Sequence, residues 1–178
     1  MNQNFLALGL EENLVQAVEQ LGFEKPSPVQ EKCIPIVLNE DTDLVALAQT
    51  GTGKTASFGL PLIQKIDTGH KKTQALVLAP TRELCIQITA DLKDFASFKK
   101  TNVVAVYGGA SITDQAKKLK KGAQIIVATP GRLQDMINRR LVDLSHIDYL
   151  VLDEADEMLN MGFQEAIDEI LETASKER

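Results

Sequence analysis

Short apolar runs alternate with longer stretches of helical spacing along most of the chain. The runs are continuous and rich in Val, Leu and Ile, which is typical of strands buried on both faces of a sheet. The strands expected on this basis are Leu44–Ala48, Ala75–Ala79, Val103–Tyr107, Ile125–Ala128 and Tyr149–Leu152. This alternation favours an α/β fold, with a parallel sheet flanked by helices and ligands at the carboxyl ends of the strands.

The stretches between the runs place apolar residues on one helical face. Two such faces are formed by Leu84, Ile88, Leu92 and Phe95, and by Phe163, Ile167, Ile170, Leu171 and Ala174. Near the N-terminus, a helical stripe of Leu14, Val18 and Leu21 stops at Gly22, and a second helix is expected from about Val29 to Leu38. We therefore expect a helical flank over residues 1–40 and a sheet domain over residues 41–178.

Composition and charge narrow the class of protein. The chain of 178 residues is 44% apolar and 25% charged, which is ordinary for a soluble domain. It has no apolar run of the roughly 18 residues that a membrane span needs, and no secretory signal is evident, so a cytoplasmic location is expected. Cys33 and Cys85 fall in apolar helical patterns and are expected to be reduced core residues. The net charge of −6 argues mildly against holding nucleic acid by bulk charge.

A glycine-rich segment, Ala48-Gln49-Thr50-Gly51-Thr52-Gly53-Lys54-Thr55, follows the first expected strand. Glycines let the backbone wrap closely round a phosphate, and the N–H groups of the next helix then point at the anion. Lys54 can reach the β and γ phosphates of a nucleotide, and the Thr55 hydroxyl can ligate Mg²⁺. The pattern departs from the usual phosphate loop only at Ala48, where glycine is usual. The alternative is a glycine-rich strand–helix turn without a ligand.

An acidic segment, Asp153-Glu154-Ala155-Asp156, follows the last expected strand. A carboxylate at Asp153 can hold Mg²⁺ directly or through water. Glu154 would point to the opposite side, where it can act as general base on the attacking water, and Asp156 lies just beyond. The alternative is a helix N-cap with acidic first-turn residues. With the phosphate loop, this segment indicates an NTP-hydrolysing core.

At this point the sequence resembles the DEAD-box RNA helicases, whose name is the sequence at 153–156. Gly22–Gln30 resembles that family's adenine-reading motif, Phe5 its isolated upstream aromatic residue, and Ala48–Thr55 its phosphate loop, alanine included. Three further segments resemble its RNA-contacting motifs, namely Pro80-Thr81-Arg82-Glu83-Leu84, Gly108-Gly109 and Thr129-Pro130-Gly131-Arg132.

The resemblance implies a RecA-like fold, ATP and Mg²⁺ as cofactors, and RNA as partner. Catalysis would fall to Lys54, Asp153, Glu154 and Asp156, with Mg²⁺ on Thr55 and Asp153. ATP would be contacted by Phe5, Phe23, Lys25, Gln30, Thr50, Gly51, Thr52, Gly53, Lys54, Thr55 and Ala56. The Gln30 amide suits adenine N6 and N7 and is mismatched to guanine, and Phe23 could pack against the base.

RNA backbone would be contacted, independently of base sequence, by Pro80, Thr81, Arg82, Gly108, Gly109, Thr129, Pro130, Gly131 and Arg132. Taken singly, these residues could equally cap helices or, for Arg82, pair with an acid. Two parts of the family pattern are missing: a strand carrying Ser-Ala-Thr, which the family fold places between the phosphate-loop and acidic strands, and the second RecA-like domain.

The leading interpretation is therefore the ATP- and RNA-binding first domain of an ATP-dependent RNA helicase, which is expected to be incomplete at its C-terminus and inactive alone. One alternative is a non-catalytic ATP- and RNA-binding module. Another is a DNA translocase, against which Gln30 and its flanking residues discriminate.

Overall fold

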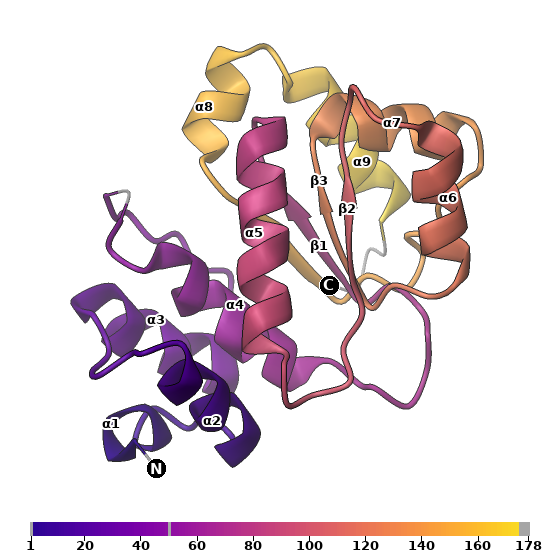
Figure 1. The fold of residues 1–178 in the computed structure, drawn as a ribbon. Coiled ribbons are helices and arrows are strands. Elements are labelled where there is room, and N and C mark those ends of the chain that lie inside the picture. Colours follow the sequence, from indigo (N-terminus) through magenta and orange to yellow (C-terminus); the bar gives the residue numbers. More distant parts are fainter. Residues whose placement is uncertain (1, 50, 175–178) are drawn as a thin grey trace. The chain divides into compact units, whose positions relative to one another are not determined.

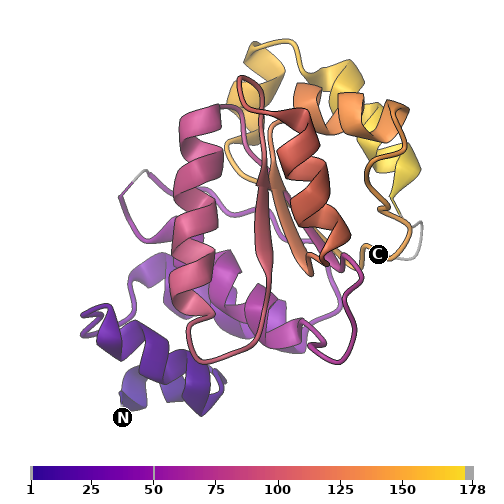
Figure 2. The ribbon, with the colours of Figure 1, turned by 45° about the vertical axis from the view of Figure 1, so that its right-hand side comes forward.

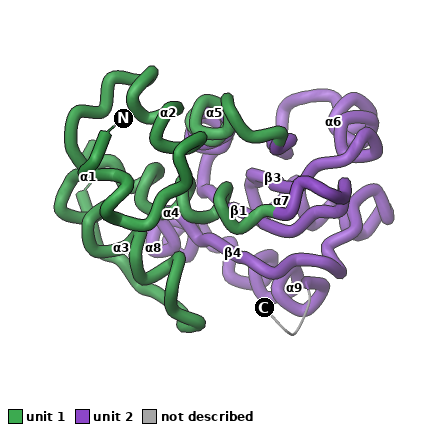
Figure 3. The backbone as a smooth tube through the Cα atoms, turned by 90° about the horizontal axis from the view of Figure 1, so that it is seen from below, with its two compact units in different colours: residues 1–66, 91–100 green, residues 67–90, 101–178 purple. Residues whose placement is uncertain are grey.

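The computed structural model describes residues 2–49 and 51–174, which form two compact units (Figure 3). The first unit comprises residues 1–66 and 91–100, and the second comprises residues 67–90 and 101–178. This division does not follow the boundary expected near residue 40, because helix α3 (Pro28–Asn39) packs against helix α4 (Lys54–Lys65) within the first unit. The phosphate loop therefore belongs to the same compact unit as the N-terminal helices.

The first unit begins with α1 (Gln3–Leu6) and α2 (Glu12–Gln20), followed by α3. The expected stripe on α2 is buried at Leu14 and Val18, but Leu21 lies beyond the helix and is 41% exposed. Helix α3 has proline at its first position, where a missing N–H costs nothing. Its N-terminus carries a capping box formed by Ser27 and Gln30.

The second unit is built on a four-stranded sheet in the order β2-β3-β1-β4, and every pairing in it is parallel. The strands are β1 (Ala75–Leu78), β2 (Val103–Val106), β3 (Ile125–Ala128) and β4 (Tyr149–Leu152). Leu78 is level with both Ala128 and Leu152, so neighbouring strands end at one edge. The predicted parallel sheet is confirmed, as are four of its five predicted strands.

Helices cover this sheet and supply its core. They are α5 (Arg82–Phe95), α6 (Ile112–Lys120), α7 (Pro130–Asn138), α8 (Ala155–Asn160) and α9 (Gln164–Thr173). Alternate strand residues such as Leu76, Val104 and Ile126 join side chains of α6 to α9 in one cluster. Helix α6 lies beside β2, and α7 lies beside α9 (Figure 1 and Figure 2). No helix of the described residues is long and apolar enough to cross a membrane.

The predicted strand over Leu44–Ala48 is wrong for this structure. These residues form no strand, and Val45 and Leu47 are 87% and 96% exposed. A strand exists only through hydrogen bonds to a neighbour, and none of the strands within residues 2–49 and 51–174 pairs with this segment. Strand β4 lies at an edge of the sheet, and Leu152 is 37% exposed.

Candidate functional site: phosphate loop, acidic turn and strand-end loops

The phosphate loop leads into α4 through two glycines in the left-handed region. Gly51 has φ 80° and Gly53, the N-cap of α4, has φ 79°. The Thr52 hydroxyl donates to the carbonyl of Gln49 over 2.7 Å, which ties the turn together. Lys54 and Thr55 are half-buried in the first turn of α4. The predicted residue Thr50 lies outside the described residues.

Gln30 is joined directly to this loop. Its Nε2 donates to the carbonyl oxygen of Gly53 over 3.1 Å, and its Oε1 accepts from the N–H of Ser27 over 2.9 Å. The residue is only 2% exposed. A Cβ atom on Gly53 would collide with Gln30 Nε2, so a side chain here would displace the Gln30 amide as well as strain the backbone at its positive φ angle. The structure thus brings the predicted adenine reader and the predicted phosphate loop together.

The two predicted aromatic residues contact each other. Phe5 and Phe23 meet edge to face with ring centroids 6.2 Å apart, and Phe23 makes a similar contact with Phe95 at 6.3 Å. Phe5 is fully buried, whereas Phe23 is half-buried. Phe5 therefore supports Phe23 rather than presenting a face of its own, and Lys25 is exposed in the following turn.

The acidic segment forms the turn from β4 to α8 in the second unit. Asp153 is 6% exposed, and its N–H donates to Leu78 over 2.9 Å, so it continues the pairing of β4 with β1. Glu154 has φ 53° and ψ 49°, a left-handed conformation that non-glycine residues seldom adopt. Such conformations cluster at functional sites. Asp156 is exposed in the first turn of α8, and Ala155 begins the helix.

The capping role weighed for Thr81 is confirmed, because its hydroxyl accepts from the N–H of Leu84 over 3.2 Å at the start of α5. Pro80 is buried at the end of β1. The Arg82 guanidinium lies over the ring of Tyr107, 5.2 Å from its centroid. Gly108 and Gly109 are the exposed residues after Tyr107, and a Cβ on Gly109 would lie 3.1 Å from Arg82 Nη1.

Arg132 is tied to the same loop. Its Nη1 donates to the carbonyl of Ala110 over 2.9 Å and to Gln115 Oε1 over 3.3 Å. Thr129, the N-cap of α7, donates its N–H to Val106 over 3.0 Å. Pro130 is buried and Gly131 exposed in the first turn of α7. Sequence reasoning missed Tyr107 and Gln115, since no local spacing signals a glutamine that bonds to a distant loop.

The two cysteines are free and buried, as predicted for core residues. Cys85 on α5 donates to the carbonyl of Val127 over 3.2 Å. Burial raises the pKa of the Cys85 thiol from 9.0 to about 11, so the reactive thiolate is scarce at neutral pH. Within the described residues, no group of three or more His, Cys, Asp or Glu side chains could hold a metal ion.

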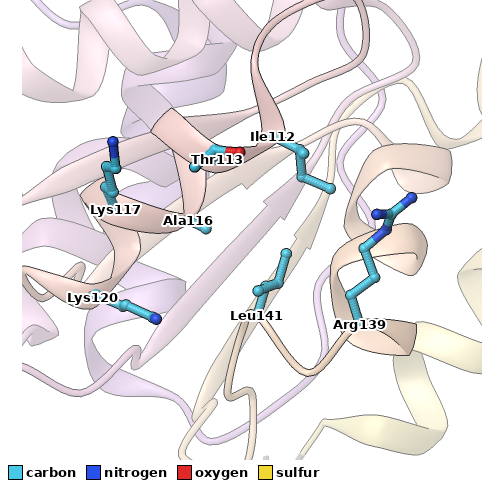
Figure 4. Close-up of a pocket in the computed structure, with 7 residues that line it drawn as sticks. All are labelled: Ile112, Thr113, Ala116, Lys117, Lys120, Arg139 and Leu141. Atoms are coloured by element: carbon cyan, nitrogen blue, oxygen red, sulfur yellow. The ribbon is translucent and has the colours of Figure 1, made fainter.

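A separate cavity of about 480 Å³ lies along α6 and the residues that follow α7 (Figure 4). Ile112 and Leu141 project into the space between these segments (Figure 4). Two of its basic side chains have acidic partners, Lys117 with Asp114 at 3.8 Å and Arg139 with Asp135 at 2.7 Å. None of the predicted site residues lines this cavity.

Comparison with known proteins agrees with this arrangement. A family model described as DEAD/DEAH box helicase matches residues 27–178. The ATP-dependent RNA helicase CshA of Listeria monocytogenes is 53% identical over 174 residues, which are 98% of this chain and 33% of that protein. The DEAD-box ATP-dependent RNA helicase CshA of Geobacillus kaustophilus is 48% identical, with 98% of this chain and 37% of that protein covered.

A solved structure also has a closely similar fold. The crystal structure of a DEAD box protein from the hyperthermophile Methanococcus jannaschii matches with a TM-score of 0.94 and 44% identity, covering 98% of this chain and 48% of that one. The chain therefore belongs to the DEAD/DEAH box helicase family, and its fold is the predicted RecA-like one. It spans about a third of the length of the curated relatives it matches.

Proposed function

We propose that this chain is the ATP- and RNA-binding first domain of an ATP-dependent RNA helicase that acts in the cytoplasm. In the intact protein, a second RecA-like domain completes the machinery, and Mg²⁺-dependent ATP hydrolysis drives local opening of RNA duplexes. The names of the relatives support the activity, and their greater length supports the second domain. The observation that carries the proposal is the bond from Gln30 Nε2 to the carbonyl of Gly53.

That bond matters because one donor and one acceptor position of the Gln30 amide stay available for a base. A glutamine amide has two N–H donors and a carbonyl oxygen that accepts twice. Gly53 takes one donor, and the N–H of Ser27 takes one acceptor position. One donor and one acceptor position remain, which is the pair that adenine N7 and N6 require. The same side chain would thus sense the base and hold the loop that binds the phosphates.

ATP would be held at the phosphate loop by groups that the first unit already orders. The N-terminus of α4 favours anions through its N–H groups and its dipole. Lys54 and Thr55 in its first turn carry the cation and the hydroxyl expected to face phosphates and Mg²⁺. Phe23, supported by Phe5, is the aromatic surface we assign to the base.

Mg²⁺ is assigned to Asp153 and Thr55, and the general base to Glu154. Carboxylate and hydroxyl oxygens are the ligands that Mg²⁺ prefers, and it usually keeps several waters. One or two protein ligands therefore suffice for such an ion. The bound ion would neutralise charge developing on the phosphates. Glu154, held in its left-handed turn, would accept the proton of the attacking water.

RNA is assigned to the loops at the carboxyl ends of β1, β2 and β3. These carry Arg82, Gly108, Gly109 and the segment from Thr129 to Arg132, which offer guanidinium groups, hydroxyls and exposed backbone. Groups of this kind suit sugar–phosphate contacts rather than base readout. The contact between Arg82 and Tyr107 supports treating the loops as one surface.

The nucleotide preference tests the proposal. Residues 1–178 should bind ADP at least about tenfold more tightly than GDP by calorimetry, because guanine would leave a paired amide group unsatisfied at roughly 1–3 kcal/mol. Gln30→Leu should abolish most of this preference. Equal affinities of the unmodified chain for ADP and GDP would contradict the role of Gln30, and binding of neither nucleotide would contradict the ATP site as a whole.

A further inference from the structure

One buried side chain holds the backbone just after β2. Gln115 on α6 donates from Nε2 to the carbonyl oxygen of Tyr107 over 3.0 Å. Its Oε1 accepts from the Tyr107 N–H over 3.3 Å. The residue is 5% exposed. Its amide therefore makes the two hydrogen bonds that a neighbouring strand would otherwise make, at the point where β2 has ended.

The same amide reaches a second loop. Gln115 Oε1 also accepts from Arg132 Nη1 over 3.3 Å, and that nitrogen donates to the carbonyl of Ala110 over 2.9 Å. Because a guanidinium is planar and rigid, two bonds from one nitrogen fix its plane relative to the loop. Arg132 is thus oriented by Ala110, which follows Gly108 and Gly109, and by Gln115, which also bonds to Tyr107 in front of them.

The third segment, which contains Arg82, contacts the same loop at Tyr107. The Arg82 guanidinium lies over the Tyr107 ring, 5.2 Å from the ring centroid. Gly109 has φ 77°, and a Cβ there would lie 3.1 Å from Arg82 Nη1. The loop of residues 107–110 therefore contacts Arg82 and Arg132, which belong to the other two segments assigned to RNA. Gln115 fixes the backbone of that loop through its bonds to Tyr107.

We propose that Gln115 is a positioning residue that sets the affinity for RNA without touching it. This inference rests on the RNA-binding part of the proposed function. If the loop and Arg132 are ordered in advance, RNA binding does not have to order them, and that entropy cost is not subtracted from the affinity. If this clamp, meaning the hydrogen bonds from the Gln115 amide to Tyr107 and Arg132, is lost, the same phosphate contacts form, but only after the loop has been ordered.

This mechanism has a signature that a phosphate contact lacks. Each lost Lys or Arg contact to phosphate lowers the slope of log affinity against log salt by about one. Gln115 is uncharged, so its loss should weaken RNA binding equally at every salt concentration. Arg82→Ala should instead flatten the salt dependence.

The chain offers a matched control. Gln74 is also a buried glutamine, 4% exposed, whose amide bonds to both the N–H and the carbonyl of a single residue. It accepts from the N–H of Asp67 over 2.9 Å and donates to the carbonyl of Asp67 over 2.8 Å. It precedes β1, at the opposite end of the strands from the loops assigned to RNA. Methionine is close to glutamine in size and cannot make either bond.

The experiment compares Gln115→Met and Gln74→Met in residues 1–178 at low salt, where phosphate contacts are strongest. Fluorescence anisotropy with a single-stranded RNA oligonucleotide should show roughly tenfold weaker binding for Gln115→Met with an unchanged salt slope. Gln74→Met should lose a similar amount of thermal stability and keep the affinity of the unmodified chain. Hydrogen exchange without RNA should accelerate at residues 107–110 in Gln115→Met only.

A second variant covers the case in which Gln115→Met does not fold. Gln115→Asn keeps an uncharged amide, but its side chain is one methylene shorter and cannot keep the bonds to both Tyr107 and Arg132, so its affinity should be intermediate. If the unmodified chain binds RNA and every folded Gln115 variant binds it equally well, the inference is overturned and the proposed function stands. If the unmodified chain has no RNA affinity at low salt, the proposed RNA site fails, and this inference with it.

Discussion

Gly53 and Gly51 have nearly the same φ angle but different surroundings. Their φ angles are 79° and 80°, so alanine is strained at either position. Only at Gly53 would the added Cβ also collide with the Gln30 amide, while nothing lies within 4 Å at Gly51. Gly51→Ala should lower the free energy of unfolding by about 1–2 kcal/mol. Gly53→Ala should cost about 1–3 kcal/mol more, because the Gln30 hydrogen bond is broken as well.

Urea unfolding of both variants measures this difference. A similar loss of stability in the two variants would mean that Gln30 moves aside at no cost, and its bond to Gly53 would then not order the loop. The comparison isolates the contact because the backbone strain is common to both positions.

Lys54 and Glu154 should divide the work on ATP between binding and chemistry. Lys54→Ala removes a mobile cation at the loop and should abolish detectable ATP binding. Glu154→Gln keeps the shape of the side chain but removes its charge, so ATP binding should stay nearly intact. Hydrolysis by the two-domain protein should nevertheless stop. Nucleotide calorimetry and steady-state turnover check the two halves; if Glu154→Gln weakens binding as much as Lys54→Ala, Glu154 has a structural role.

At the scale of elements, the local pattern of apolar residues was enough to predict most strands and helices. The runs at β1 to β4 are continuous and apolar, and each was recognisable from a few consecutive residues, although only β1 and β3 are buried throughout. The helices were equally visible through their buried faces, for instance Ile88 and Leu92 on α5. Leu44–Ala48 has the same local pattern and forms no strand, because pairing depends on a partner far away in sequence.

The candidate site divides in the same way. The phosphate loop and acidic turn are contiguous segments, so their residues could be found by spacing alone. Gln115 and the occupied amide of Gln30 could not, because each acts through hydrogen bonds to distant backbone atoms. Nothing in the sequence around Glu154 signalled its positive φ angle either, since glutamate is an unusual residue for that conformation.

A neighbouring strand should convert Leu44–Ala48 into a strand. In a protein extended through the family's Ser-Ala-Thr strand, Val45 and Leu47 should become buried and their amides protected from hydrogen exchange. Leu47→Gln should then cost about 2–3 kcal/mol of unfolding free energy. In residues 1–178, where Leu47 is 96% exposed, the same change should fall within about 0.5 kcal/mol of neutral.

Denaturant unfolding of the two lengths of protein, each with and without Leu47→Gln, makes this comparison. Val37→Thr is a useful control, because Val37 lies within α3, is half-buried in the structure and should respond alike in both proteins. A large loss of stability from Leu47→Gln in residues 1–178 would show that the segment is already packed there.

At the scale of the whole molecule, residues 1–178 span about a third of the length of the curated relatives they match, and we propose that phosphoryl transfer also needs the family's second domain. An arginine finger is worth roughly 10³–10⁵ in rate, and the family's finger lies in that domain. Residues 1–178 should therefore bind ADP or ATP weakly and turn over ATP negligibly, with no stimulation by RNA. RNA binding by residues 1–178 should also be weak, because their net charge is −6 and the proposed RNA cleft includes the second domain.

A coupled phosphate-release assay with and without RNA tests this directly, with the two-domain protein as the positive control. RNA-stimulated turnover by residues 1–178 that disappears in Glu154→Gln would contradict the expected dependence on a second domain. Turnover that persists in that variant would come from a contaminating enzyme.

The glutamine clamps have a consequence for how this fold tolerates change. Gln74 and Gln124 bind the backbone of Asp67 and Asn102, not their side chains. The hydrogen bonds from these glutamines do not depend on the loop side chains, although Asp67 Oδ1 also accepts from the N–H of Gly69 over 2.7 Å. An amide also carries no charge at any pH, so the hold does not loosen in acid as a carboxylate clamp would. Mutational scanning should find that substitutions of Gln74 and Gln124 are tolerated less well than substitutions of the exposed loop residues that make no side-chain hydrogen bond.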